Sequence, residues 1–224
     1  MGNLYVVATP IGNLEDITLR ALRVLREADL IACEDTRTTR KLCARHDIKT
    51  KLISFFQHSR PEKIQQLITE LNNGRDIALV SEAGTPCISD PGTLLVSAAV
   101  EAGISVIPIP GACAVTAAAS ASGLPVDKFS FYGFLPRKKG RQKIIAQILD
   151  EDKTAIFYES PHRIIKTLEQ IVELEPSTKI VLAKELTKKF EQILRGSVTD
   201  VLAKLKEPDK VKGEIVVIIN QKNA

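Results

Sequence analysis

Residues 76–107 read DIALVSEAGTPCISDPGTLLVSAAVEAGISVI, and they contain one complete strand–helix–strand unit. The apolar run at 76–80 predicts a buried strand, and apolar residues at helical spacing predict a helix over 91–102 that ends at Gly103. A second apolar run follows at 104–107. Such a unit places its two strands parallel in one sheet, with the helix crossing over one face.

The same alternation fills the residues before this unit. The predicted strands are 4–8, 30–33 and 51–55, and the predicted helices are 17–28, 36–45 and 61–73. Successive strand–helix–strand units predict a parallel sheet with helices on both faces. The strands are hydrophobic along nearly their whole length, as expected for a sheet that is covered on both sides.

The pattern changes near residue 110. A helix rich in Ala, Ser and Thr is predicted at 112–122, and Gly123 then interrupts the chain. The strands predicted after it are 129–134, 155–158, 180–183, 192–194 and 215–219, and the helices are 140–150, 161–174 and 198–206. Because the chain between 183 and 192 is too short for a helical crossover, the strands on either side of it are predicted to be antiparallel neighbours. We therefore predict the α/β class with two domains: 1–123 with a parallel sheet and 124–224 with a mixed sheet.

Composition excludes several classes of protein. Hydrophobic residues make up 44% and charged residues 26%, with a net charge of +4, which is ordinary for a globular domain. No apolar run is long enough to span a bilayer, and no signal-peptide pattern opens the sequence. The four cysteines form no CxxC pair and the three histidines are scattered, which favours reduced thiols in a cytoplasmic protein and no metal site.

The loops that follow the predicted parallel strands predict a ligand site, because ligands bind beyond the carboxyl ends of such strands. These loops are 9–13, 34–37, 81–92 and 108–112, and three of them are rich in Gly and Pro, which allows a ligand close to the backbone. The first strand is not followed by GxGxxG, and GxxxxGK[ST] is absent from the sequence. A cofactor without a pyrophosphate is therefore favoured.

The sequence resembles the tetrapyrrole methylase superfamily, and within it the ribosomal RNA small-subunit methyltransferase I group. The matching segments are LYVVATPIGNLEDIT (4–18), IACEDTRTT (31–39), ALVSEAGTPCISDPG (78–92), VIPIPGACAVTAA (106–118), GFLPRK (133–138), IFYESPHR (156–163), VLAKELTK (181–188) and KGEIV (212–216). TPIGN, EDTR and AGTP are the most specific of them. The group commonly continues beyond the KGE strand with a helical extension, whereas this sequence ends at Ala224.

The resemblance implies the tetrapyrrole methylase fold, with S-adenosylmethionine in the cleft between two α/β domains. It implies methylation of a ribose 2′-oxygen of a cytidine in the decoding region of small-subunit ribosomal RNA, by a homodimer. The donor-binding residues that it implies are Glu82, Gly84, Thr85, Cys113, Ala114, Tyr158, Ala183 and Gly213.

The ribose hydroxyl is a weak acid, so a base can assist its attack on the methyl group. Asp35, Lys184 and Glu185, with Glu34 beside them, are ionisable groups at predicted strand ends. Each has a structural alternative: Asp35 can cap the following helix, and Glu185 can pair with Lys184 or Arg163. The candidate RNA contacts are Arg37, Arg40, Arg137, Lys138 and Lys139, although such basic clusters can also be solvated surface.

Two other functions stay open. One is methylation of a tetrapyrrole precursor by the same fold. The low aromatic content of 4%, which offers little surface for stacking on a macrocycle, argues weakly against it. The other is a non-catalytic RNA-binding assembly factor.

Overall fold

The computed structural model describes residues 1–56, 60–206 and 211–220. Backbone contacts divide the chain into two compact units, Met1–Cys113 and Ala114–Ala224. The sequence placed the boundary at residue 123, whereas the helix α5 (Ala114–Ser120) contacts strands of the second unit. Arg195 of that unit also donates hydrogen bonds to the carbonyls of Ala121 and Ser122. The segment after Cys113 therefore belongs with the second unit.

The first unit is a parallel five-stranded sheet in the order β3-β2-β4-β1-β5. Its elements are β1 (Leu4–Val7), η1 (Leu14–Asp16), α1 (Leu19–Glu27), β2 (Leu30–Cys33), α2 (Thr36–Arg45), β3 (Lys51–Ser54), α3 (Pro61–Asn72), β4 (Ile77–Val80), α4 (Thr93–Glu101) and β5 (Val106–Ile109). All four strand pairs are parallel, so every loop that follows a strand leaves from the same edge of the sheet.

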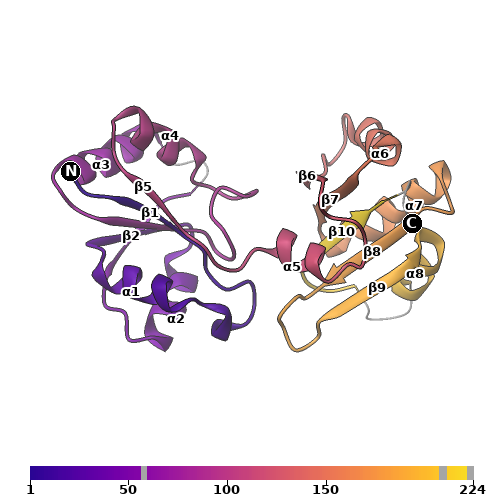
Figure 1. Ribbon diagram of the computed structural model, residues 1–224, viewed down its shortest axis with the longest axis horizontal. Helices are drawn as coiled ribbons and strands as arrows, with labels where there is room; N and C mark the ends of the chain where they lie inside the picture. Colours follow the sequence, from indigo (N-terminus) through magenta and orange to yellow (C-terminus); the bar gives the residue numbers. More distant parts are fainter. Residues whose placement is uncertain (57–59, 207–210, 221–224) are drawn as a thin grey trace. The chain divides into compact units, whose positions relative to one another are not determined.

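Helices cover both faces of this sheet, as predicted. Figure 1 shows α1 and α2 on one face and α3 and α4 on the other. Alternate residues of one strand point to opposite faces. In β4, Ala78 and Val80 pack in the core with α1 and α2, while Ile77 and Leu79 pack in the core with α3 and α4. Burial on both faces explains the unbroken hydrophobicity of the strands.

The second unit is a mixed five-stranded sheet in the order β6-β7-β10-β8-β9. Its elements are α5, β6 (Phe129–Phe134), α6 (Arg141–Asp150), β7 (Thr154–Glu159), α7 (Pro161–Leu174), β8 (Lys179–Lys184), β9 (Gln192–Ser197), α8 (Val198–Leu205) and β10 (Ile215–Ile219). β6 and β7 are parallel, and the other pairs are antiparallel. The predicted antiparallel pairing of 180–183 with 192–194 is confirmed, and β10 lies in the centre.

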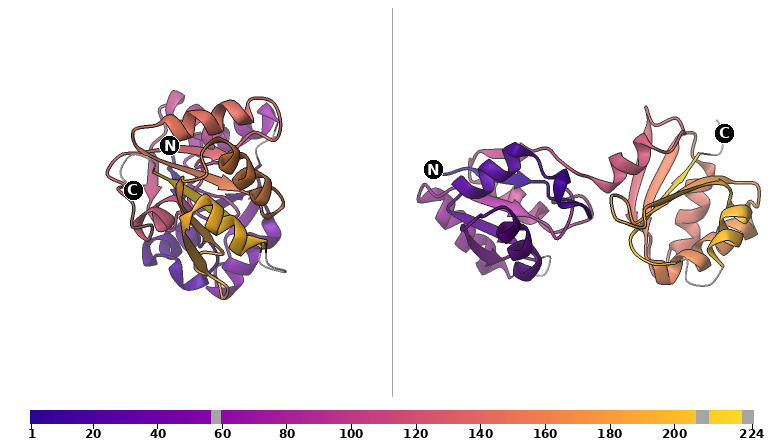
Figure 2. Two further views of the ribbon diagram at one scale, coloured as in Figure 1. Left: turned by 90° about the vertical axis from the view of Figure 1, so that its right-hand side faces the viewer. Right: turned by 90° about the horizontal axis from the view of Figure 1, so that it is seen from below.

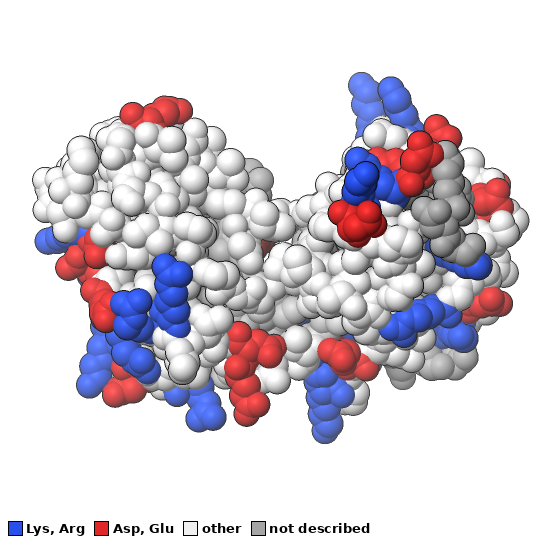
Figure 3. Space-filling view, in the orientation of Figure 1, with Lys and Arg blue, Asp and Glu red and all other residues white. Residues whose placement is uncertain are grey.

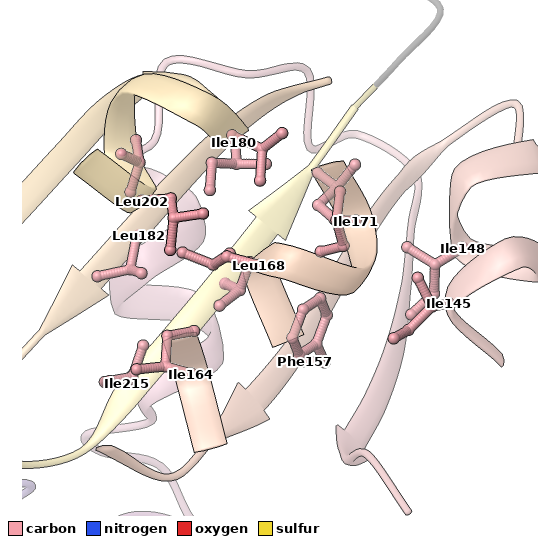
Figure 4. Packing of buried hydrophobic residues seen from close by; sticks show 14 of the residues in the cluster. Ile145, Ile148, Phe157, Ile164, Leu168, Ile171, Ile180, Leu182, Leu202 and Ile215 are labelled. Atoms are coloured by element: carbon pink, nitrogen blue, oxygen red, sulfur yellow. The ribbon is translucent and has the colours of Figure 1, made fainter. Parts of the chain in front are cut away.

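One face of the second sheet carries the main core of the unit. Figure 4 shows Phe157, Leu182 and Ile215 of the strands facing Ile164 and Leu168 of α7. α5 contacts β7 and β10, whose residues Ile156, Val216 and Ile218 are also buried. Figure 2 shows α5 on one side of this sheet and α7 and α8 on the other. Within the described ranges, the structure has no helix that is long and apolar enough to cross a membrane.

Candidate functional site

Two loops at the carboxyl edge of the first sheet are joined through their backbones. The amide of Thr9, after β1, donates to the carbonyl of Gly84, after β4, at 2.9 Å, and the amide of Gly84 donates to the carbonyl of Thr9 at 2.9 Å. A third loop joins them, because the Thr85 hydroxyl donates to the carbonyl of Ala112 at 3.1 Å. The segments TPIGN, AGTP and PIPGA therefore form one connected edge, as expected from their places after parallel strands.

Gly84 needs to be glycine for two reasons. Its φ is +78°, a left-handed conformation that other residues adopt only with strain. A Cβ at this position would lie 3.2 Å from Cγ2 of Ile11 and 3.7 Å from the carbonyl oxygen of Ala112. The backbone of this loop is thus packed closely against the neighbouring loops, which gives the edge a fixed shape.

Thr9 has an unsatisfied hydroxyl at this edge. The residue is only 4% exposed, and its Oγ1 has no hydrogen-bond partner within the described part of the chain. Leaving a buried hydroxyl unpaired costs about 1–3 kcal/mol, so a partner supplied by a ligand would be favourable. The sequence singled out TPIGN as a motif but assigned no role to Thr9 itself.

Acidic groups surround the same edge. Burial, and then the negative charges of Glu82 and Asp90, raises the pKa of the Glu34 carboxyl above its usual value. Two negative charges from the loop after β4 therefore act on the carboxyl group that follows β2. This environment favours a cation over a phosphate, and it fits the positively charged sulfonium and amino groups of S-adenosylmethionine. The unpaired Thr9 hydroxyl is a further group that can hydrogen-bond to such a donor.

Asp35 caps a helix, which is the structural alternative that the sequence left open. Its carboxylate accepts hydrogen bonds from the backbone amide of Arg37 at 2.7 Å and from Nη2 of that residue at 2.8 Å. These hydrogen bonds lower the pKa of Asp35 to about 2. A carboxylate that binds protons so weakly is a poor general base. The Arg37 side chain is exposed but already forms an ion pair with Asp35. Arg40 is also exposed, on the same helix.

In the second unit, two of the predicted donor residues flank the same residue of the central strand β10. Tyr158 of β7 and Ala183 of β8 both pair with Val216 of β10, from opposite sides. The Tyr158 ring also contacts Phe131 and Phe134, with centroids at 5.0 Å and 5.4 Å. Ala183 is fully buried, backbone included.

Gly213 and Glu185 occupy one small space. A Cβ at Gly213, where φ is +82°, would lie 1.8 Å from Oε1 of Glu185. Glu185 itself has φ +51°, and its carboxylate accepts a hydrogen bond from Lys188 at 2.9 Å. Lys188 is thus a partner of Glu185 that the sequence did not suggest, while Arg163 pairs with Glu159. Lys184 is the half-buried last residue of β8.

Cys113 and Ala114 lie where the two units join in the chain. Ala114 begins α5, and both residues are half-buried. None of the four cysteines, which all lie in described ranges, is in a disulfide; Cys33 and Cys43 are buried, and Cys87 and Cys113 are half-buried. In the described residues, no group of His, Cys, Asp and Glu could hold a metal ion.

The basic run at 137–143 divides into two kinds of residue. Arg137, Lys138 and Lys139 are exposed, as RNA contacts would have to be. Arg141 is instead only 5% exposed and forms an ion pair with Glu159 at 2.8 Å. The burial of Arg141 could not be predicted, because nothing local to it in the sequence indicates a partner in the distant segment ESPHR (159–163).

Known proteins match the chain over nearly its whole length. The profile of the family described as Tetrapyrrole (Corrin/Porphyrin) Methylases matches residues 3–202. A relative from Halalkalibacterium halodurans, named Ribosomal RNA small subunit methyltransferase I, is 50% identical over 97% of this chain and 75% of its own length. Relatives of the same name are 50% identical in Escherichia coli O157:H7, over 97% of this chain and 77% of theirs, and 43% identical in Thermotoga maritima, over 99% and 100%.

Solved structures confirm the fold. A diphthine synthase aligns with a TM-score of 0.79 and 16% identity, over 100% of this chain and 92% of its own. A uroporphyrin-III C-methyltransferase from Thermus thermophilus, in complex with S-adenosyl homocysteine, aligns with a TM-score of 0.67 and 18% identity, over 98% of both chains. At such identities the likeness extends to the fold alone.

Proposed function

Because the chain belongs to the tetrapyrrole methylase family, in its ribosomal RNA small-subunit methyltransferase I group, we propose that it methylates small-subunit ribosomal RNA with S-adenosylmethionine. The observation that carries the proposal is the identity of about half of all residues, over 97% of the chain, with relatives of that name. We further propose the 2′-oxygen of a cytidine in the decoding region as the acceptor. A ribosomal RNA substrate implies a cytoplasmic location.

The donor supplies an electrophilic methyl group on a sulfonium, and the protein has to hold the acceptor oxygen in line with it. We assign the donor contacts to Glu82, Gly84, Thr85, Cys113, Ala114, Tyr158, Ala183 and Gly213. The fixed backbone of the edge supports this assignment for Gly84 and Thr85, since rigid loops lose little entropy when they bind a ligand. The acidic groups at that edge stabilise the positive charge of the donor.

Among the neighbouring carboxyl groups, Glu34 suits proton acceptance better than Asp35. Its pKa is raised, mainly by burial, whereas that of Asp35 is lowered to about 2. A base works best when its pKa approaches the working pH. If Glu34 removes the ribose proton, we expect Glu34→Gln to lower kcat by about a hundredfold, with a much smaller loss of donor affinity from the missing negative charge. A kcat within twofold of the unaltered protein would leave Lys184 and Glu185 as the candidate bases.

The substrate is tested by mapping methyl groups on ribosomal RNA. Small subunits from cells that lack the gene are digested and compared by mass spectrometry with subunits from cells that carry it. We expect one ribose methyl near the decoding centre to be lost, and to return after incubation with purified protein and S-adenosylmethionine. If every ribose methyl remains, the proposed acceptor is wrong. Absence of donor binding by calorimetry at millimolar concentration would instead favour the non-catalytic assembly factor.

A tetrapyrrole precursor is the second candidate acceptor. The neighbours with that activity in their titles, such as the uroporphyrin-III C-methyltransferase, share only the fold with this chain. The homodimer implied by the family stays a prediction, which sedimentation at micromolar protein would test.

A further inference from the structure

A basic pocket lies in the second unit where β6 leads into α6. Its volume is about 420 Å³, and its lining includes Arg137, Lys138, Arg141, Lys143, Lys166 and Gln170. Five of these six side chains are cationic, and none of the described residues that line the pocket is acidic. Lys166 comes from α7, so the pocket joins segments that are far apart in the sequence.

The buried base of the pocket is Arg141, whose guanidinium donates four hydrogen bonds. It donates to Oε1 of Gln170 at 2.9 Å, to the carbonyl of Pro136 at 3.0 Å and to the carboxylate of Glu159 at 2.8 Å. It also donates to the hydroxyl of Thr167. Arg141 therefore fixes the segment before α6 to α7 and to the end of β7.

The buried network carries an excess of positive charge. Glu159 is 1% exposed and pairs with two guanidinium groups, that of Arg141 at 2.8 Å and that of Arg163 at 2.7 Å. Arg163 also donates to the carbonyl of Leu135 at 3.0 Å. Two cations share one carboxylate, so the network is left with one net positive charge. An anion at the adjoining surface would balance this charge.

The N-terminus of α6 adds partial positive charge beside the same pocket. Gly140, with φ +82°, is the N-cap residue, and neither a capping side chain nor an acidic residue neutralises the first turn. The free amides at a helix N-terminus carry partial positive charge and bind anions.

The four remaining cations form an exposed rim. Arg137, Lys138, Lys143 and Lys166 are all exposed, and none of them forms an ion pair with another described residue. Figure 3 shows Lys and Arg side chains projecting from the part of the second unit that carries α6. Such side chains remain available to a ligand.

We infer that this pocket binds one phosphate group of the RNA backbone, held by Lys143 and Lys166 beside Arg137 and Lys138. The inference rests on the proposed function for the identity of the RNA. It adds a discrete site, held rigid from beneath by Arg141 and Glu159, to the exposed Arg137, Lys138 and Lys139. It also gives a role to the ESPHR segment (159–163), because Glu159 and Arg163 support the pocket that contacts the RNA.

The test compares two double variants with the same loss of charge. Lys143→Gln with Lys166→Gln removes two pocket cations and leaves Arg141 in place. Lys179→Gln with Lys204→Gln removes two exposed cations outside the pocket. The Kd for a ribosomal RNA fragment that contains the decoding region is measured from 0.05 to 0.3 M KCl. S-adenosylmethionine binding by each variant checks that the fold is intact.

We expect the pocket variant to bind RNA about tenfold more weakly at 0.15 M salt and to reduce the slope of log Kd against log salt by about one. The control variant should change the Kd by less than threefold. Equal losses in the two variants would overturn the inference, because they describe diffuse attraction without a bound phosphate. A weaker Kd with an unchanged slope would also overturn it, because no phosphate contact has then been lost.

A small molecule that carries a phosphate group could occupy the same pocket in place of RNA. Inorganic phosphate is therefore titrated into both variants and the unaltered protein. Tight binding of inorganic phosphate that only the pocket variant loses, with RNA affinity unaffected, would overturn the assignment to RNA. Failure of the proposed function is seen separately, as absence of methyl transfer by the unaltered protein, whatever its salt dependence.

Discussion

At the edge of the first sheet, the loops are joined backbone to backbone, whereas the segment before α6 in the second unit is held by side-chain charges. The first region depends on the Thr9–Gly84 bridge and on a glycine with positive φ. The second depends on one buried carboxylate, Glu159, which bonds to Arg141 and Arg163. Added atoms should therefore disturb the first region, and lost charge should disturb the second.

The largest effect is expected from the loss of the buried carboxylate. Glu159→Ala leaves two guanidinium groups without their partner, so we expect a loss of about 3–5 kcal/mol in the free energy of unfolding. Urea unfolding followed by circular dichroism measures it. The matched control is Glu169→Ala, which breaks a solvent-exposed pair with Lys206 and should cost less than about 1 kcal/mol. Similar costs for the two variants would show that charge does not hold this region.

An added methyl group at the loop edge of the first sheet should weaken ligand binding. Gly84→Ala and Gly103→Ala each force a Cβ onto a residue with positive φ, at a cost of about 1–2 kcal/mol in stability. Space around Gly103 is open, whereas a Cβ at Gly84 lies 3.2 Å from Ile11. We therefore expect only Gly84→Ala to weaken S-adenosylmethionine binding, by about tenfold, as measured by calorimetry. Alanine is chosen because a larger side chain such as valine would crowd Ile11 further and disturb the fold more.

If the two glycine variants bind the donor equally well, the connected loops do not form the donor site. If Gly84→Ala unfolds the protein while Gly103→Ala does not, the same edge is needed for stability, and a smaller change such as Thr85→Ser then tests the ligand contact.

The smallest effect concerns Asp35, a charge that acts locally at the first edge. Its pKa is about 2 in the folded protein and 3.8 without its partners, so the charged cap stabilises the fold above pH 4. This advantage is lost as the pH falls toward 2. The difference in thermal midpoint between the unaltered protein and Asp35→Asn should therefore shrink over that range. A kcat for Asp35→Asn that falls a hundredfold at pH 7.5, with donor binding intact, would instead make Asp35 a catalytic group.

Much of the fold could be predicted from hydrophobic spacing. The bounds of β2, α2, β6, α7 and β10 agree with the prediction. β5 begins and ends two residues later than expected, because Pro108 and Ile109 were interpreted as part of a turn. Proline is tolerated there since β5 is an edge strand, which needs fewer backbone donors. β9 continues to Ser197 through Arg195 and Gly196, a charged residue and a glycine that interrupt the apolar run of this edge strand.

The candidate site could be predicted only in part. The positions of the loops follow from the parallel topology, so the meeting of Thr9, Gly84 and Ala112 was within reach of the sequence. The pairing of Arg141 with Glu159 was not, because no periodicity links residues of α6 and β7. Lys166 was missed for the same reason: its role depends on how α7 packs beside α6. Spacing identifies elements, but contacts between distant charges depend on the packing itself.

The central position of β10 has a consequence for folding while the chain is being synthesised. The first sheet is complete once residue 109 has been synthesised, but the second lacks its middle strand until residues 215–219 emerge. Until then β7 and β8 each have an unpaired side, and exposed strand edges promote association between chains. The second unit should therefore be the part of the nascent chain that most needs protection by chaperones on the ribosome.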